Sequence, residues 1–244
     1  MLMEKALVII PAYNEARNIA RVIGEIRKHN GSIDILTVND GSSDATPEIA
    51  AACGSAVVSL PFNLGYGVAL QTGYKYALRE GYDYVVQMDA DGQHDPQYIG
   101  KFLEEIAKKE ADVLIGSRFL SEKCYKISWA RAMGMGLFSG ISSFIIKQRV
   151  TDSTSGYQCI DKDVLGFFVN DIYPCDYPDA DVIIMLHLAG FRIQEIPVVM
   201  LANNENKTMH SGIRPLYYVF KMFLSIFVTL LRKRPSGYRR SACS

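Results

Sequence analysis

The sequence predicts an α/β fold in which helices flank a mostly parallel central sheet. First, short apolar, β-branched runs alternate with longer segments of helical character through the first half of the chain. Second, polar residues directly follow the predicted strands, as they do where ligands bind beyond the carboxyl ends of parallel strands. Third, an apolar segment near the C-terminus predicts a final amphipathic helix suited to a membrane interface.

The predicted strands of the first half are apolar almost throughout, which is typical of strands covered on both faces, and they span 5–11, 33–39, 56–60, 83–89 and 111–117. The segments between them have the length of crossover helices, at 15–29, 44–53, 66–80 and 96–109. The second half predicts, in order, a helix at 127–147, a turn-rich stretch at 151–158, a helix at 180–189, a strand at 191–200, a polar loop at 203–212 and the apolar C-terminal helix. We expect one α/β domain over 1–212, followed by a helix and basic tail over 213–244 that associates with a membrane or with another protein chain.

Composition and charge exclude several classes of protein. The 26 Lys and Arg residues balance 26 Asp and Glu residues, whereas binding to nucleic acid through its phosphates depends on a basic excess. A hydrophobic content of 49% excludes disorder as the dominant state. Five scattered cysteines without metal-ligand spacing, and an N-terminus without a signal-peptide pattern, predict a reduced, cytoplasmic setting. The segment Leu216–Leu231 contains Lys221 and is too short to predict a membrane span.

The strongest chemical signal is a pair of carboxylates, Asp89 and Asp91, where a predicted buried strand ends. No basic residue lies near them in the sequence, and Mg²⁺ is typically held by one or two carboxylates together with substrate phosphates. The alternative is structural: Asp91 and Gly92 would form a turn, and Asp95 would cap the following helix. Both interpretations stay open on the residues alone.

A second signal is Asp40, which also ends a predicted buried strand, where a carboxylate needs a donor or a ligand to offset its desolvation. A ribose hydroxyl or a base N–H would serve, whereas Ser43 or Asp44 suits the cap of the next helix. The Gly65–Gly67 run follows the third predicted strand instead of the first, and residue 70 is Leu, so a dinucleotide-binding fingerprint is not indicated. We expect these glycines to allow close packing instead of phosphate contact.

Four motifs occur in order along the chain: Pro11-Ala12-Tyr13-Asn14-Glu15, Val38-Asn39-Asp40-Gly41-Ser42-Ser43-Asp44, Asn63-Leu64-Gly65-Tyr66-Gly67 and Met88-Asp89-Ala90-Asp91-Gly92-Gln93. Over about residues 5–200 the chain resembles family 2 glycosyltransferases of the Rossmann-like GT-A fold, and it is most similar to dolichol- and polyprenyl-phosphate sugar synthases. The resemblance implies a nucleotide sugar held by Pro11, Tyr13, Glu15, Asp40, Asp89, Ala90, Asp91 and Arg118. It also implies Mg²⁺ or Mn²⁺ held by Asp89, Asp91 and Gln93.

The resemblance further implies catalytic residues near the acceptor. Arg118 and Arg131 would lie near an acceptor phosphate, for which a guanidinium fork is suited. The alternative is that Arg131 is a surface side chain. The sequence also departs from related synthases one turn later, where they often have a hydroxyl and this chain has Met135. Asp181, or Asp179 beside it, would act as a general base, although both also suit the first turn of a helix.

Two loops complete the site that the resemblance implies. The segment 151–158 would line the sugar pocket, and the alternative is that Asp152 forms a simple Asx turn. His210 would reach the diphosphate when its loop closes, and the alternative is a solvated loop histidine.

The implied reaction is an inverting, metal-dependent transfer from a UDP- or GDP-linked sugar to undecaprenyl or dolichyl phosphate, for cell-surface glycan synthesis. A phosphate monoester, with a second pKa near about 6, attacks without a protein base, whereas a glycan hydroxyl, the alternative acceptor, needs one. A third hypothesis is a catalytically silent subunit that binds a nucleotide sugar. The donor base stays open because contacts at Tyr13, Glu15 and Asp40 suit uracil or guanine.

The C-terminal segment bears on location and partners. Leu216–Leu231 is followed by a basic cluster that suits an anionic membrane surface, namely Arg232, Lys233, Arg234, Arg239 and Arg240. The alternative is a core or oligomer-interface helix, so a small membrane protein and a second copy of the chain are further candidate partners. We expect peripheral attachment to the cytoplasmic face of a membrane and no nucleic-acid partner.

Overall fold

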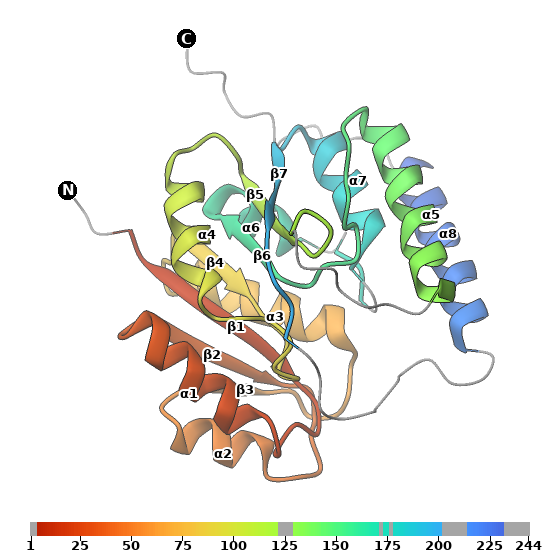
Figure 1. The fold of residues 1–244 in the computed structure, drawn as a ribbon. Helices are drawn as coiled ribbons and strands as arrows, with labels where there is room; N and C mark the ends of the chain where they lie inside the picture. Colours follow the sequence, from red (N-terminus) through yellow and green to blue (C-terminus); the bar gives the residue numbers. More distant parts are fainter. Residues whose placement is uncertain (1–3, 122–128, 171–172, 176–177, 202–213, 232–244) are drawn as a thin grey trace.

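The computed structural model describes residues 4–121, 129–170, 173–175, 178–201 and 214–231, with positions 129–135 and 214–219 described for their backbone alone. Its central feature is one seven-stranded sheet with helices on both faces (Figure 1). In chain order the elements are β1 (Ala6–Ala12), α1 (Ile19–Asn30), β2 (Asp34–Asn39), α2 (Thr46–Ala52), β3 (Ala56–Ser59), α3 (Tyr66–Arg79), β4 (Tyr84–Gln87), α4 (Tyr98–Ala107), β5 (Val113–Ser117), α5 (Trp129–Ile146), β6 (Gln158–Asp161), α6 (Lys162–Phe168), α7 (Ala180–Ala189), β7 (Ile193–Pro197) and α8 (Arg214–Leu231). The predicted α/β class is confirmed.

The strands lie in the order β3-β2-β1-β4-β6-β5-β7, and β6 alone in this sheet is antiparallel, to both β4 and β5. The sheet is therefore mostly parallel, as predicted. The register pairs Ala12 with Asn39 and Ile9 with Gln87, so the carboxyl ends of β1, β2 and β4 lie side by side. This edge of the sheet is where the predicted site residues meet.

Several elements differ from the sequence prediction. The sequence does not predict β6 or α6, because a buried strand of 4 residues and a helix of 7 are too short for their periodicity to show. Helix α1 begins at Ile19 instead of residue 15, since the carbonyl of Glu15 accepts backbone bonds from Asn18 and Ile19 in a turn. Strand β7 ends at Pro197 instead of residue 200, and the predicted polar loop at 203–212 lies outside the described residues.

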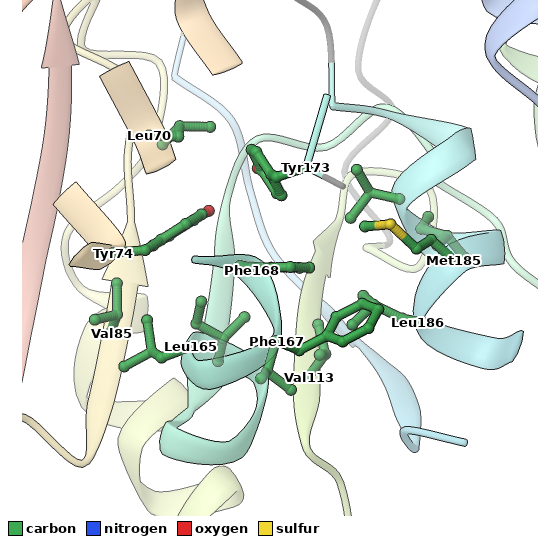
Figure 2. Close-up of a cluster of buried hydrophobic side chains, with 14 of the residues drawn as sticks. Leu70, Tyr74, Val85, Val113, Leu165, Phe167, Phe168, Tyr173, Met185 and Leu186 are labelled. Carbon is green, nitrogen blue, oxygen red and sulfur yellow. The ribbon is translucent and has the colours of Figure 1, made fainter. Parts of the chain in front are cut away.

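Two hydrophobic cores cover the two faces of the sheet. Alternate residues of β1 serve them in turn, with Ile9 in one core and Ile10 in the other. The first core joins α3, α6 and α7, where Tyr74 packs on Phe168 with ring centroids 5.3 Å apart (Figure 2). The second core lies under α1 and α4. Because both faces are covered, the strand ends are left as the place where polar groups gather.

Helices α5, α7 and α8 pack together at one end of the molecule (Figure 1). Residues 180–186 of α7 are all buried, and Met222 and Ile226 of α8 belong to the same core. Phe138 of α5 contacts Phe223 of α8, with ring centroids 5.6 Å apart. One face of α8 therefore packs on the protein, as a core helix would, and the domain boundary at 212 stays a prediction. Among the helices of the described residues, none combines the length and apolar character that crossing a bilayer would require.

A buried carboxyl at the start of α6 predicts a pH effect on folding. Asp161 is the N-cap of α6 and accepts a hydrogen bond from the Val164 N–H. Burial, opposed by that bond, raises the pKa of Asp161 from 3.8 to about 6. The folded protein therefore holds this proton more tightly than the unfolded chain, so stability falls as pH rises through this window and stays lower above it.

Replacing Asp161 with Asn should remove this loss of stability, because the Asn side chain has no proton to lose in this pH range. Asn also caps helices, so the bond to Val164 can be kept. We expect the free energy of unfolding at pH 7.5 to rise by about 1–2 kcal/mol and its decline between pH 4 and pH 6 to flatten, both measured by urea denaturation. Asp163→Asn, an exposed change in the same helix, is the control. An equal gain in the control variant would contradict the explanation.

Candidate active site

Asp40 follows β2 at the carboxyl edge of the sheet and is almost fully buried. Its Oδ1 accepts the Leu64 N–H at 2.7 Å and its Oδ2 accepts the Gly65 N–H at 3.0 Å. Gly41 has φ +67°, and a Cβ there would lie 2.4 Å from the carbonyl carbon of Phe62. The donors that Asp40 was expected to need therefore come from the loop 62–65, which lies directly on the end of β2.

The loops after β1 and β2 are held together by hydrogen bonds. The Asn14 N–H donates to Ser42 Oγ and the Glu15 N–H to Thr46 Oγ1, each at 2.9 Å. Asp44 accepts the Thr46 N–H at 3.1 Å at the start of α2, but the N-cap position is Ala45, so neither Ser43 nor Asp44 occupies the cap as predicted. With the two loops joined in this way, Tyr13 is exposed, Pro11 is buried and Glu15 is half-buried. All three lie at the end of β1 or in the loop that follows it.

Asp89 follows β4, which is separated from β2 by β1 in the sheet, and it is held from two sides. Its Oδ1 accepts the Tyr66 hydroxyl at 2.7 Å, its backbone N–H donates to His94 Nδ1 at 3.0 Å, and its Oδ2 lies 3.6 Å from His94 Nε2. His94 is buried and stacks on Tyr157, with ring centroids 4.8 Å apart. These contacts fix both the backbone and the carboxylate of Asp89.

Asp91 lies close enough to Asp89 for the two charges to repel. Burial, and next the charge of Asp89, raise the pKa of Asp91 above its ordinary value. The backbone N–H of Gln93 donates to Asp91 Oδ1 at 2.9 Å, and the Gln93 amide donates to Oδ2. Ala90 between the carboxylates is buried. The three predicted metal-site residues therefore do lie together, with two like charges that a cation would neutralise.

The structural alternative for this loop is also observed in part. Gly92 has φ +77°, as a turn position would, and a Cβ there would meet the guanidinium of Arg21 at 2.3 Å. Asp95 Oδ1 accepts the Gln97 N–H at 3.0 Å, one residue before α4. Asp95 is therefore a structural residue, and the turn at Gly92 coexists with the paired carboxylates.

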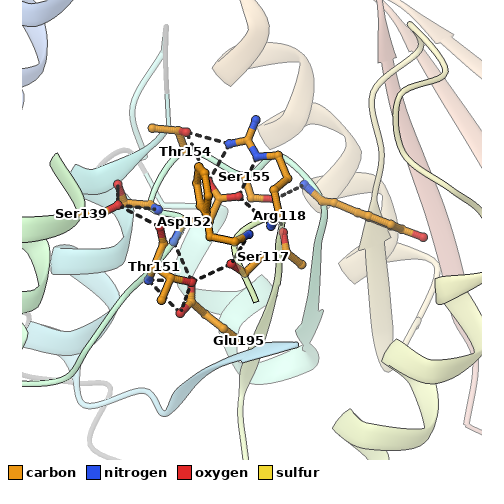
Figure 3. Close-up of polar contacts among 12 residues, drawn as sticks. Ser117, Arg118, Ser139, Thr151, Asp152, Thr154, Ser155 and Glu195 are labelled. Atoms are coloured by element: carbon orange, nitrogen blue, oxygen red, sulfur yellow. Dashed lines mark hydrogen bonds and ion pairs between the residues drawn. The ribbon is translucent and has the colours of Figure 1, made fainter. Parts of the chain in front are cut away.

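Arg118 follows β5 and forms a buried ion pair instead of pointing into open solvent (Figure 3). Its Nε donates to Asp152 Oδ2 at 2.7 Å, and one terminal nitrogen donates to Asp152 Oδ1 at 2.6 Å and to Thr154 Oγ1 at 2.9 Å. Asp152 is fully buried, and its N–H, with that of Thr151, donates to Glu195 on β7. Asp152 thus pairs with an arginine and does more than close an Asx turn. A phosphate-binding role for Arg118 stays a prediction.

The segment 151–157 reaches the paired carboxylates. A Cβ placed on Gly156 would lie 3.2 Å from Asp89 Oδ2 and 3.1 Å from the Tyr66 hydroxyl. Gly67, by contrast, packs against the carbonyl of Pro174, and Gly73 packs against Ile9 of the sheet. Close packing therefore accounts for Gly67, as expected, whereas Gly65 has φ +101° and donates its N–H to Asp40. Gly156 brings the second half of the chain to Asp89.

Asp181 lies in the first turn of α7 and faces α8. Its Oδ1 accepts the N–H of Asp179 at 3.1 Å and of Val182 at 2.9 Å, and its Oδ2 accepts the Ser225 hydroxyl. Burial is the main cause that raises the pKa of Asp181. These contacts suit the helix-start interpretation, and a general-base role stays a prediction.

Some predicted residues fall beyond what the structure describes. Arg131 and Met135 lie in α5 at positions described for their backbone alone, and His210 and the basic tail lie outside the described residues. Sequence reasoning missed Tyr66, His94 and Glu195. The only signals were a tyrosine between two glycines, a histidine in the loop after Asp91 and a carboxylate inside a predicted strand. None of these identifies its distant partner.

The donor set at the edge fits a hard divalent cation. Among the described residues, no group of three or more His, Cys, Asp and Glu side chains is placed to hold a metal. Two carboxylates beside an amide oxygen, completed by substrate phosphates, is instead the arrangement that Mg²⁺ favours. Asp89, Asp91 and Gln93 are the residues that would supply those protein oxygens.

The Rossmann-like sheet and the paired carboxylates after β4 match the arrangement that the resemblance to GT-A glycosyltransferases implies. The chain belongs to glycosyl transferase family 2, whose family model matches residues 7–165. The family resemblance predicted from the four motifs is therefore confirmed, and the protein is a glycosyltransferase.

Known proteins similar to this chain include two bacterial enzymes. Polyprenol monophosphomannose synthase of Mycolicibacterium smegmatis is 32% identical over 169 residues, which is 66% of this chain and 63% of that protein. Undecaprenyl-phosphate mannosyltransferase of Micrococcus luteus is 29% identical over 225 residues, covering 85% of this chain and 88% of that protein.

The solved structure of glucosyl-3-phosphoglycerate synthase from Mycobacterium tuberculosis, in complex with Mn²⁺, UDP and glucosyl-3-phosphoglycerate, matches with a TM-score of 0.67. Its identity is 20%, and the match covers 98% of this chain and 82% of that one. This likeness confirms the fold.

Proposed function

We propose that this glycosyltransferase transfers a sugar from a nucleotide sugar to polyprenyl phosphate, with inversion at the anomeric carbon and with Mg²⁺ or Mn²⁺ as cofactor. The observation that carries the proposal is the Asp89 and Asp91 pair after β4, in contact with the segment 151–157. The relatives from Mycolicibacterium smegmatis and Micrococcus luteus, named for transfer to polyprenol and undecaprenyl phosphate, support the acceptor class.

The residues at the edge divide the work of binding the donor. Asp89, Asp91 and Gln93 would hold the cation, which when bound neutralises charge on the leaving nucleoside diphosphate. Tyr13 is 49% exposed after β1 and offers an aromatic face to the nucleotide base. Asp40 stabilises the loop 62–65 beside that position. The sugar would then lie toward the segment 151–157.

The surroundings of Asp181 favour a phosphate acceptor over a glycan hydroxyl. Its side chain is 1% exposed, and both oxygens accept hydrogen bonds within α7 or from Ser225. A base in this setting is poorly placed to activate a sugar hydroxyl, which needs one. A phosphate monoester is largely dianionic at neutral pH and attacks without that help.

An exposed apolar face on α5 and α8 supports attachment to a membrane surface. We call this the α5–α8 face, and its exposed members are Leu137, Phe144, Phe220, Phe223, Leu224, Phe227, Val228, Leu230 and Leu231. The opposite side of α8 packs on the protein through Met222 and Ile226. A helix with one face committed to protein and the other apolar and exposed suits a position in the plane of the interface. The five basic residues that follow in the sequence would meet anionic headgroups.

Placing two carboxylates on this face should weaken attachment. The double variant Phe220→Glu and Phe227→Glu replaces two exposed rings, and we expect about a tenfold or greater loss of binding to anionic phospholipid vesicles in sedimentation assays. The control, Lys75→Gln with Lys101→Gln, lowers the net charge by the same two units, on α3 and α4 away from this face. Equal losses in both double variants would indicate a charge effect instead of a docking face.

The proposal is tested by incubating the purified protein with Mg²⁺, undecaprenyl phosphate and each of a panel of UDP- and GDP-sugars. We expect one donor to yield a polyprenyl-phosphate sugar, with loss of product in EDTA. Transfer to a glycan hydroxyl but not to the lipid phosphate would replace this proposal with the second acceptor class. Nucleotide-sugar binding without turnover on either acceptor would favour a silent binding subunit.

A further inference from the structure

A directed chain of buried hydrogen bonds ends on Asp89. The Tyr74 hydroxyl donates to Gln87 Oε1 at 2.5 Å, and the Gln87 amide donates to the Tyr66 hydroxyl oxygen at 3.1 Å. The Tyr66 hydroxyl then donates to Asp89 Oδ1 at 2.7 Å. Each donor points toward the carboxylate, so each bond polarises the next in the same sense.

The chain sits in a closely packed setting. Tyr74 and Gln87 are buried, and Tyr74 meets Tyr173 edge to face with ring centroids 5.6 Å apart. Tyr66 is the first residue of α3, and Gly67 after it packs against the carbonyl of Pro174. Tyr66 also packs against the first core, so contacts other than the bond to Asp89 hold its ring in place.

The position of this bond gives it a consequence for the donor site. Gly156 approaches both the Tyr66 hydroxyl and Asp89 Oδ2, so the bond lies where the segment 151–157 meets the paired carboxylates. With Oδ1 engaged by Tyr66, the carboxylate has one orientation before any ligand arrives. A ligand group fixed in advance binds more tightly, because less conformational freedom is lost on binding.

We propose that Tyr66 is a positioning residue, whose hydroxyl orients the Asp89 carboxylate for the divalent cation on the nucleotide diphosphate. This inference rests on the proposed function, because it needs a metal-dependent nucleotide site at Asp89. It differs from a general contribution to stability, since it predicts a loss specific to metal-dependent binding.

The test compares Tyr66→Phe with a matched variant. Tyr82→Phe also removes a tyrosine hydroxyl that donates to an aspartate, Asp34, at 2.9 Å, but near the amino ends of β2 and β4. Calorimetry measures UDP and GDP affinity as MnCl₂ is increased, and again in EDTA. We expect Tyr66→Phe to weaken Mn²⁺-dependent affinity by about tenfold or more, to leave affinity in EDTA unchanged, and Tyr82→Phe to bind as the wild type does.

The outcomes separate this inference from the proposed function. A wild-type protein without Mn²⁺-dependent nucleotide binding would overturn the proposed function itself. Metal-dependent binding in the wild type with equal affinity in Tyr66→Phe would overturn only the positioning role, as would equal losses in Tyr66→Phe and Tyr82→Phe. If Tyr66→Phe does not fold, Tyr74→Phe interrupts the same chain two hydrogen bonds before Tyr66. An unchanged Mn²⁺-dependent affinity in Tyr74→Phe would then count against the inference.

Discussion

Replacing Asp89 with Asn should lower kcat/KM for sugar transfer by at least about a thousandfold, because it removes a charge at the proposed cation site. The amide has nearly the same shape, and its oxygen can still accept the Tyr66 hydroxyl. The loss should therefore appear in turnover and in metal-dependent nucleotide binding, without collapse of the fold. Steady-state kinetics with varied donor and calorimetry with MnCl₂ measure the two effects.

Stability provides a second readout for the same variant. The charge of Asp89 contributes to the raised pKa of Asp91, so its removal relieves a repulsion between buried groups. We expect the melting temperature of Asp89→Asn without ligand to stay level or rise. Asp95→Asn, in the same loop but bonded to the Gln97 N–H, is the control and should keep transfer within about twofold of the wild type. A comparable loss in the control would mean that the loop, and not the charge at Asp89, limits the reaction.

Replacing Arg118 with Gln should lower the free energy of unfolding by about 3–5 kcal/mol, because it leaves the buried Asp152 carboxylate without its cation. Arg118 donates three bonds to the Asp152 carboxylate, two from its guanidinium and one from its backbone, and a further one to Thr154 (Figure 3). Asp152 is fully buried, so water cannot take the place of these donors. Urea denaturation at pH 7.5 measures the loss.

The matched control is a second ion pair of the same geometry near the surface. Arg192 donates to both oxygens of Asp112, at 3.2 and 2.7 Å, but its side chain is 43% exposed, against 16% for Arg118. Asp112 is buried, so Arg192→Gln should also lower the free energy of unfolding, but by less than Arg118→Gln, because water reaches the more exposed Arg192 side of this pair. If the two variants cost the same while Arg118→Gln alone reduces transfer, Arg118 acts on substrate, as the family resemblance implies.

Residues close together in the sequence made the predictable part of the site. Asp89, Asp91 and Gln93 lie within five positions after one strand, so their proximity follows from local geometry alone. The alternating strands and helices likewise predicted the sheet up to β5, because each crossover is a local unit. Contacts between residues far apart in the sequence could not be predicted in this way. Asp152 lies 34 residues from Arg118, and no periodicity links the two.

For Asp40, the sequence predicted the need for hydrogen-bond donors but not which groups would supply them. The sequence correctly predicted that a carboxylate at the end of a buried strand needs donors. The donors are backbone N–H groups of Leu64 and Gly65, which every residue type except proline possesses. No side-chain pattern could therefore identify them. Strand β6 was missed for a related reason, since its place between β4 and β5 depends on pairing with strands far away in the chain.

The reversed direction of β6 decides which residues of the second half of the chain lie at the carboxyl edge of the sheet. A strand that ran with its neighbours would deliver Asp161, its last residue, to the carboxyl edge of the sheet. Because β6 runs the other way, its first residue, Gln158, opens at that edge, opposite Gln87 of β4. Gly156, two positions earlier, is thereby brought against Asp89. One reversed strand of 4 residues thus places the segment that precedes it against the carboxylate after β4, so that the two halves of the chain meet at the same edge of the sheet.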